Sequence, residues 1–130
     1  MWNFLSHARD TGAEILCIQE HNMGIDEMQN FARSAASSGW CCYYTLGRSC
    51  GRLGPDARTG GTLTLVDKSL KSRQAWELVQ DGGQCVGVVV GSVLVLNAYM
   101  AHHATRPAFL SDMFDFCQTV DNHTWLLVAD

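Results

Sequence analysis

Polar side chains that can bind a metal ion or a phosphate group follow three apolar segments of this chain. They are Glu20 after the run 15–19, Asn97 and Tyr99 after the run 93–96, and Asp130 after the run 125–129. In layered α/β folds, ligands gather where strands end, because the loops converge there above a core that excludes water. A carboxylate at such a place is costly to desolvate unless it meets a cation or a donor, so Glu20 and Asp130 are candidate ligands of a hard cation such as Mg²⁺. The alternatives are that the two carboxylates face solvent at the start of a loop, that Asn97 is a hydrogen-bonding residue at a strand end, and that Tyr99 belongs to the core with its hydroxyl at the edge.

Two adjacent histidines, His102 and His103, follow the third of these polar positions. Neighbouring residues of an extended chain point to opposite faces, so the pair does not readily share one metal ion. One of them, His102, is a candidate contact to a phosphate group when it is protonated. The alternative is a loop histidine without a function.

The charged residues are distributed unevenly along the chain. The 130 residues carry 9 Lys and Arg against 13 Asp and Glu, for a net charge of −4. Residues 48–73 are basic, with Arg48, Arg52, Arg58, Lys68, Lys71 and Arg73 against Asp56 and Asp67, whereas residues 107–130 contain four Asp and no Lys or Arg. The basic segment can meet phosphate groups and the acidic one a metal ion, although solvated surface charge explains both equally well.

The composition is that of one globular domain over residues 1–130. Hydrophobic residues make up 47% of the chain and charged residues 17%, which excludes collagen-like, low-complexity and strongly charged disordered proteins. The longest apolar run, 86–96, is interrupted by Gly and Ser and is too short to span a membrane, and no signal peptide is recognisable. We therefore expect an intracellular protein without a membrane span, whose six cysteines are reduced thiols.

Hydrophobic periodicity predicts helices and strands in an order typical of a layered α/β domain. The predicted helices cover 2–11, 26–38 and 106–117; the predicted strands cover 14–19, 40–45, 62–66, 74–80, 85–90, 93–96 and 125–129. We expect the first and last strands to be buried, residues 46–60 to form an irregular loop, and Gly91-Ser92 to form a tight hairpin turn. The inward helix positions are expected to be Ile25, Met28, Phe31 or Ala32, and Ala35, then Phe109 or Leu110, Met113 or Phe114, and Cys117. Because a strand is the last element and no strand precedes the first helix, the domain is expected to be truncated at both ends.

Four segments, in order, resemble motifs of the endonuclease/exonuclease/phosphatase superfamily, the fold of deoxyribonuclease I, apurinic endonucleases and retrotransposon endonucleases. They are 15–20 (ILCIQE), the glycine-led strand 60–66 (GGTLTLV), 95–102 (VLNAYMAH) and 126–130 (LLVAD). The resemblance covers nearly the whole chain. It implies the amino-terminal portion of a four-layer α/β sandwich of the deoxyribonuclease I type.

The resemblance also implies roles for individual residues. Glu20 would bind a divalent cation, Mg²⁺, against the scissile phosphate; Tyr99 would donate a hydrogen bond to a phosphate oxygen; and Asp130 would orient or deprotonate the attacking water. Asn97 and His102 would contact the substrate. Glu20, Tyr99 and Asp130 are then expected to lie together at one end of a strand layer.

This chain also departs from the family pattern. Ala101, His102 and Ala129 stand where the family has proline, an amide residue and glycine, and several further family residues have no counterpart within the sequence. We therefore expect a fragment of a Mg²⁺-dependent phosphodiesterase domain that does not hydrolyse its family's substrates (DNA, RNA, inositol phosphates or phospholipid headgroups). The alternative is a non-catalytic pseudoenzyme or relic fragment that at most binds a partner, through an exposed sheet edge or the Arg-rich loop. The exposed edge is also a candidate surface for self-association.

Overall fold

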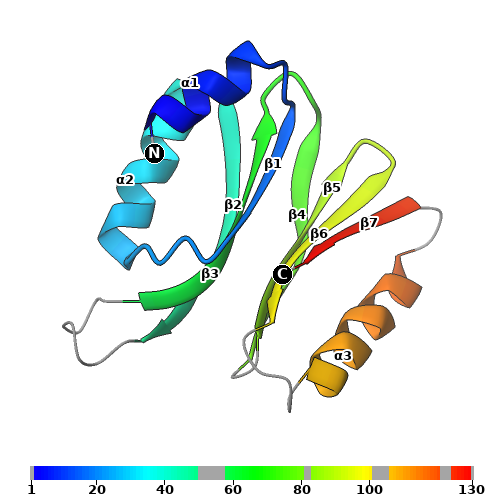
Figure 1. The fold of residues 1–130 in the computed structure, drawn as a ribbon. Helices are drawn as coiled ribbons and strands as arrows, with labels where there is room; N and C mark the ends of the chain where they lie inside the picture. Colours follow the sequence, from blue (N-terminus) through cyan, green and yellow to red (C-terminus); the bar gives the residue numbers. More distant parts are fainter. Residues whose placement is uncertain (1, 50–57, 81–82, 101–105, 121–123, 130) are drawn as a thin grey trace.

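A computed structural model describes residues 2–49, 58–80, 83–100, 106–120 and 124–129 of the chain. Strands predominate in this part, and the few helices lie on the outside of two sheets (Figure 1). In chain order the elements are α1 (Trp2–Asp10), β1 (Ile15–Gln19), α2 (Ile25–Ser37), β2 (Trp40–Ser49), β3 (Arg58–Asp67), β4 (Ser72–Gln80), β5 (Gly83–Val90), β6 (Val93–Met100), α3 (Arg106–Thr119) and β7 (Thr124–Ala129). The expected mixed α/β architecture is therefore confirmed.

The strands form one three-stranded and one four-stranded sheet. The first sheet has the order β1-β3-β2 and is antiparallel throughout; the second has the order β4-β5-β6-β7, with β6 and β7 parallel and the other pairs antiparallel. A parallel pair needs a crossover connection, and α3 lies in that connection. The predicted hairpin between β5 and β6 is confirmed, with Gly91 at φ +60° in its two-residue turn.

Each sheet packs its outer face against helices. The first outer cluster joins α1 and α2 to the three-stranded sheet through Leu5, Ala8, Met28, Phe31, Ala35, Trp40, Leu63 and Leu65. The second joins α3 to the four-stranded sheet through Phe109, Met113 and Cys117 against Leu94, Leu96 and Ala98. These helix positions are those expected from the sequence, except that Ile25 is 36% exposed at the start of α2.

The inner faces of the two sheets meet in an interface with two different ends. One end is apolar and contains Val66, Val86 and Val88, which pack with half-buried Ile15, Tyr43, Leu70 and Val90. The other end holds the buried polar side chains of the described residues, which are Thr45, Thr62, Thr64, Gln84 and Asn97. Buried polar groups are nearly always hydrogen-bonded, so this polar end is built on a hydrogen-bond network rather than on apolar packing.

The burial expected for the first and last strands is wrong. The residues of β1 are half-buried throughout, and β7 leaves Trp125 43% and Leu126 54% exposed. In the described part of the chain both are edge strands, and each pairs with a neighbouring strand on one side only. An apolar run shows that a strand prefers burial, but it does not show how many neighbours the strand has.

The expected loop at 46–60 is also wrong at both of its ends. β2 continues to Ser49 and β3 begins at Arg58, so that of this segment only residues 50–57 are not described. Gly47 permits this pairing, because a Cβ atom there would lie 1.9 Å from the Thr59 carbonyl oxygen. The glycines of this segment therefore allow two backbones to approach closely.

The cysteines of the described residues are free thiols; they are Cys17, Cys41, Cys42, Cys85 and Cys117, while Cys50 lies outside those residues. Burial raises the pKa of both Cys42 and Cys85 to about 12, so these two thiols stay protonated and unreactive near neutral pH. No helix in the described segments is both long enough and apolar enough to cross a membrane.

Candidate functional site

Glu20 and Tyr99 meet at the polar end of the interface between the sheets. Glu20 follows the last residue of β1, and Tyr99 lies near the end of β6 in the other sheet. The Tyr99 hydroxyl donates a hydrogen bond of 2.6 Å to Oε1 of Glu20. Glu20 is exposed and Tyr99 is half-buried, so the pair is open to solvent on one side. Of the three residues that were expected to lie together, Glu20, Tyr99 and Asp130, the structure brings the first two into contact.

The backbone around Glu20 adopts an uncommon conformation that the neighbouring strand holds in place. Glu20 (φ 54°) and Asn22 (φ 55°) are the non-glycine residues with positive φ in the described part of the chain. Their amides donate to the carbonyls of Gly61 at 2.9 Å and Gly60 at 3.0 Å, and the Gly60 amide donates to Oδ1 of Asn22 at 2.7 Å. Such conformations cost about 1–3 kcal/mol and persist where surrounding contacts determine them. Here the hydrogen bonds to Gly60 and Gly61 fix the backbone at Glu20, and with it the direction in which its side chain points away from the end of β1.

Gly60 and Gly61 make room for the side chains of the site. A Cβ atom on Gly60 would lie 3.1 Å from Cε1 of Tyr99 and 3.2 Å from Oε1 of Gln84. A Cβ atom on Gly61 would lie 2.4 Å from Nε2 of His21. Both glycines also have φ near +90°, which other residues rarely adopt. The two glycines at the start of the glycine-led strand 60–66 therefore let side chains pack directly on the backbone, Tyr99 on Gly60 and His21 on Gly61.

His21 is a member of the site that the sequence interpretation missed. Its Nδ1 accepts a hydrogen bond of 3.0 Å from the Met23 amide, so its Nε2 carries the proton and donates it to the Thr45 carbonyl oxygen at 2.8 Å. Burial lowers the pKa of His21, and the Thr45 carbonyl opposes this by favouring the protonated ring. The ring is thus neutral and held in one tautomer. Its position directly after Glu20 was the available signal.

The lowered pKa of His21 makes stability depend on pH. Between the folded pKa and the ordinary value of 6.5, the unfolded chain binds a proton that the folded chain resists. The contribution of neutral His21 is therefore complete above pH 6.5 and is lost as the pH falls from 6.5 through the folded pKa. Urea unfolding between pH 8 and pH 5 is expected to show a steeper loss of stability for the wild type than for His21→Gln. Parallel curves would contradict this assignment.

Asn97 lies beneath this pair and joins the two sheets. It is fully buried, and its Oδ1 accepts from Nε2 of Gln19 at 2.6 Å. Its Nδ2 donates to the carbonyl oxygens of Leu63 at 3.0 Å and Ile18 at 3.3 Å, and also lies 3.1 Å from Oγ1 of Thr64. The expected role of Asn97 was a substrate contact, with a structural hydrogen-bonding residue as the alternative. The contacts support the alternative, because its amide bonds within the chain and positions β1 and β3 against β6.

Two of the expected site residues, Asp130 and His102, lie outside the described residues. The last described residue of β7, Ala129, pairs with Ala98, which directly precedes Tyr99. Within the described segments, no group of three or more His, Cys, Asp or Glu side chains is placed to hold a metal ion. These segments therefore offer Glu20 as a single carboxylate at the site, which does not amount to a built metal centre.

No protein-family model and no curated protein matches this chain. The functional interpretation therefore depends on the geometry of the Glu20–Tyr99 pair and on the sequence motifs that contain it.

Proposed function

We propose that this chain is part of an endonuclease/exonuclease/phosphatase domain and that Glu20 and Tyr99 form its phosphoester site. One observation carries the proposal, namely the 2.6 Å hydrogen bond between the Tyr99 hydroxyl and the Glu20 carboxylate. The two residues are separated by 79 positions and come from different sheets, Glu20 directly after β1 and Tyr99 within β6. They are nevertheless the two described residues to which the family motifs assign the metal ion and the phosphate.

The arrangement of layers supports the same proposal. Two sheets lie face to face, with α1 and α2 on the outside of one and α3 on the outside of the other (Figure 1). This is the layer order of the deoxyribonuclease I-like four-layer sandwich, which we propose as the specific fold. In such folds the ligand lies where the loops at one end of the sheets converge.

The chemistry of the pair suits a phosphoester. The Tyr99 hydroxyl can donate its hydrogen bond to a phosphate oxygen instead of to Glu20. The exposed Glu20 carboxylate is then free to attract a cation. Mg²⁺, which the family uses, would have Glu20 as its ligand and would supply positive charge near the phosphate oxygens. Since the described residues form no complete metal centre, no reaction step is assigned to that ion.

We further propose that this chain binds a phosphodiester without hydrolysing it. Hydrolysis needs a metal ion held by several ligands, an oriented water and donors for the transition state. The described residues supply one carboxylate and one hydroxyl at the site. The chain would therefore act as a binding module for a nucleic acid or another phosphoester. The exposed edge strand β7, with Trp125 and Leu126, offers a surface for self-association.

The test is a titration of the whole chain with the dinucleotide d(TpT) in excess Mg²⁺, followed through backbone amide shifts. We expect saturable shifts at residues 20–22 and 60–61 and at Tyr99, with the dinucleotide still intact at the end. Tyr99→Phe removes one hydrogen bond to a charged group and is expected to weaken binding about tenfold.

Tyr44→Phe is the matched control, because Tyr44 also lies in a strand but packs on the helix-covered outer face of its sheet. Equal effects of the two variants, or shifts confined to other residues, would contradict the proposed site. Cleavage that disappears in Glu20→Ala would support the site but overturn the proposal that the chain only binds.

A further inference from the structure

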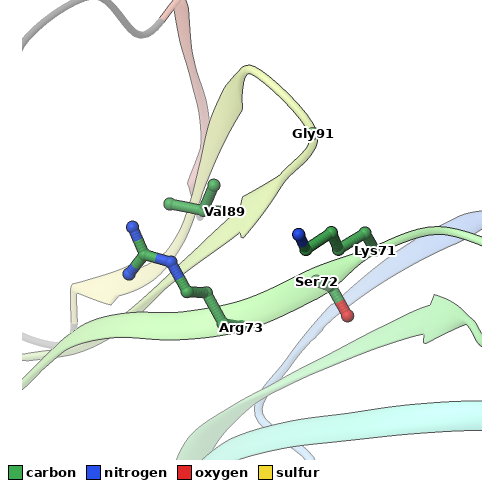
Figure 2. Close-up of a pocket in the computed structure, with 5 residues that line it drawn as sticks. All are labelled: Lys71, Ser72, Arg73, Val89 and Gly91. Carbon is green, nitrogen blue, oxygen red and sulfur yellow. The ribbon is translucent and has the colours of Figure 1, made fainter.

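A charged hollow lies beside the β5–β6 turn, at the end of the four-stranded sheet that is opposite to the Glu20–Tyr99 pair. It has a volume of about 270 Å³ and is lined by Lys71, Ser72, Arg73, Val89 and Gly91 (Figure 2). Tyr99 pairs with Gln84 near one end of the β5–β6 hairpin, whereas Val90 and Val93 flank the turn at its other end. Six residues of extended strand span roughly 20 Å, so the hollow is well separated from the Glu20–Tyr99 pair.

The two cations of the hollow share one side of the chain. Ser72, between them, points the other way and its hydroxyl lies 2.7 Å from that of Tyr43 in the facing sheet (Figure 2). Arg73 pairs with Val89, which belongs to the cluster on the outer face of the sheet. Lys71 and Arg73 therefore project away from the interface between the sheets, into solvent beside Gly91.

Neither cation has a partner among the described residues. Lys68, nearby in sequence, donates to the Ala36 carbonyl oxygen, and Arg9 pairs with Asp67. No described residue makes a hydrogen bond or an ion pair with the side chain of Lys71 or Arg73. The described lining of the hollow also contains no acidic residue. Backbone positions two residues apart in an extended chain are about 7 Å apart, so Lys71 and Arg73 hold two like charges on neighbouring side chains. Such charges repel each other, and an anion placed between them relieves that repulsion.

We infer that this hollow, the Lys71–Arg73 hollow, binds a phosphate group. A guanidinium group can bind two oxygens of one anion, and an ammonium group can bind a third. A phosphate dianion is tetrahedral, so it can present two oxygens to Arg73 and another to Lys71 at the same time. A carboxylate has one charge and two oxygens in a plane, which a single arginine already satisfies. Gly91 leaves the outer rim open, because a Cβ atom there would have no neighbour within 4 Å. The site does not depend on the proposed function of the Glu20–Tyr99 pair.

The experiment is an amide-shift titration of the whole chain with inorganic phosphate, at an ionic strength kept constant with NaCl. We expect saturable shifts at residues 71–73 and 89–91 with a dissociation constant in the millimolar range. Arg73→Gln is expected to weaken binding about tenfold, and Lys71→Gln by a smaller factor. Both residues are exposed, so unchanged amide spectra elsewhere will show that the variants remain folded.

Arg33→Gln is the matched control, since it removes one positive charge from an exposed position of α2. A second titration, with dimethyl phosphate, identifies the source of the group. Much weaker binding of dimethyl phosphate is expected, because it carries one charge and two free oxygens, and this result assigns the site to free phosphate or a phosphomonoester. Comparable affinity would overturn the inference of a dianion site and assign the hollow to a phosphodiester instead. Shifts that grow linearly without saturation, or equal weakening by Arg33→Gln and Arg73→Gln, would overturn the inference. Tyr99→Phe should leave this binding unchanged, which keeps the two sites distinguishable.

Discussion

Replacing Asn97 with alanine is expected to lower the free energy of unfolding by about 3 kcal/mol. The side chain is fully buried and bonds Gln19, Ile18, Leu63 and Thr64 from the opposite sheet. With alanine at position 97, the Gln19 amide and the Ile18 and Leu63 carbonyl groups would lose their partner, and a cavity would open between the sheets. Urea unfolding of the purified chain measures the loss directly.

The control for this variant is Asn30→Ala, at an exposed position of α2. An exposed helix substitution is expected to change stability by no more than about 0.5 kcal/mol. If Asn97→Ala costs no more than Asn30→Ala, Asn97 does not hold the two sheets together. The positioning role assigned to it would then be wrong.

Gly61→Ala is expected to cost about 3 kcal/mol and to displace His21. Gly61 has φ +92°, and the new Cβ atom would lie 2.4 Å from Nε2 of His21 and 2.9 Å from the Thr45 carbonyl oxygen. The substitution therefore combines backbone strain with a steric clash that separates the His21 ring from Thr45. Urea unfolding gives the stability, and the ring nitrogen shifts of His21 report the lost hydrogen bond.

Gly12→Ala separates the two contributions. Gly12 also has a positive φ, of 78°, but a Cβ atom there would meet nothing within 4 Å. Its replacement should cost only the backbone strain, about 1 kcal/mol. Equal losses for the two variants would show that the contact between Gly61 and His21 contributes nothing to the fold.

Much of the fold could be predicted from local sequence patterns, because helical spacing and tight turns depend on residues that are close together in the chain. The buried helix positions Met28, Phe31 and Phe109 follow from helical spacing, and the hairpin at Gly91 follows from a two-residue turn between apolar runs. The meeting of Glu20 and Tyr99 could also be expected, because each comes at the end of an apolar run, although β6 continues past the predicted 93–96 to Met100 and so contains Tyr99.

Other features depend on neighbours that a linear pattern does not reveal. The exposure of Trp125 arises because β7 is an edge strand, and edge position is a property of the assembled sheet. Asn97 looks like any polar residue near a strand end, and only the facing sheet shows that its amide is fully used. His21 owes its fixed tautomer to Thr45 and Met23, which the fold places on both sides of its ring.

The location of a bound divalent cation tests the central claim most directly. Mn²⁺ can replace Mg²⁺ on carboxylate ligands and broadens nearby amide signals. In the presence of d(TpT), the strongest broadening is expected at residues 20–22, 60–61 and 99, and it should disappear in Glu20→Gln. Broadening that survives in Glu20→Gln, or that centres on the exposed carboxylates Asp26 and Glu27 of α2, would contradict a phosphoester site at the Glu20–Tyr99 pair.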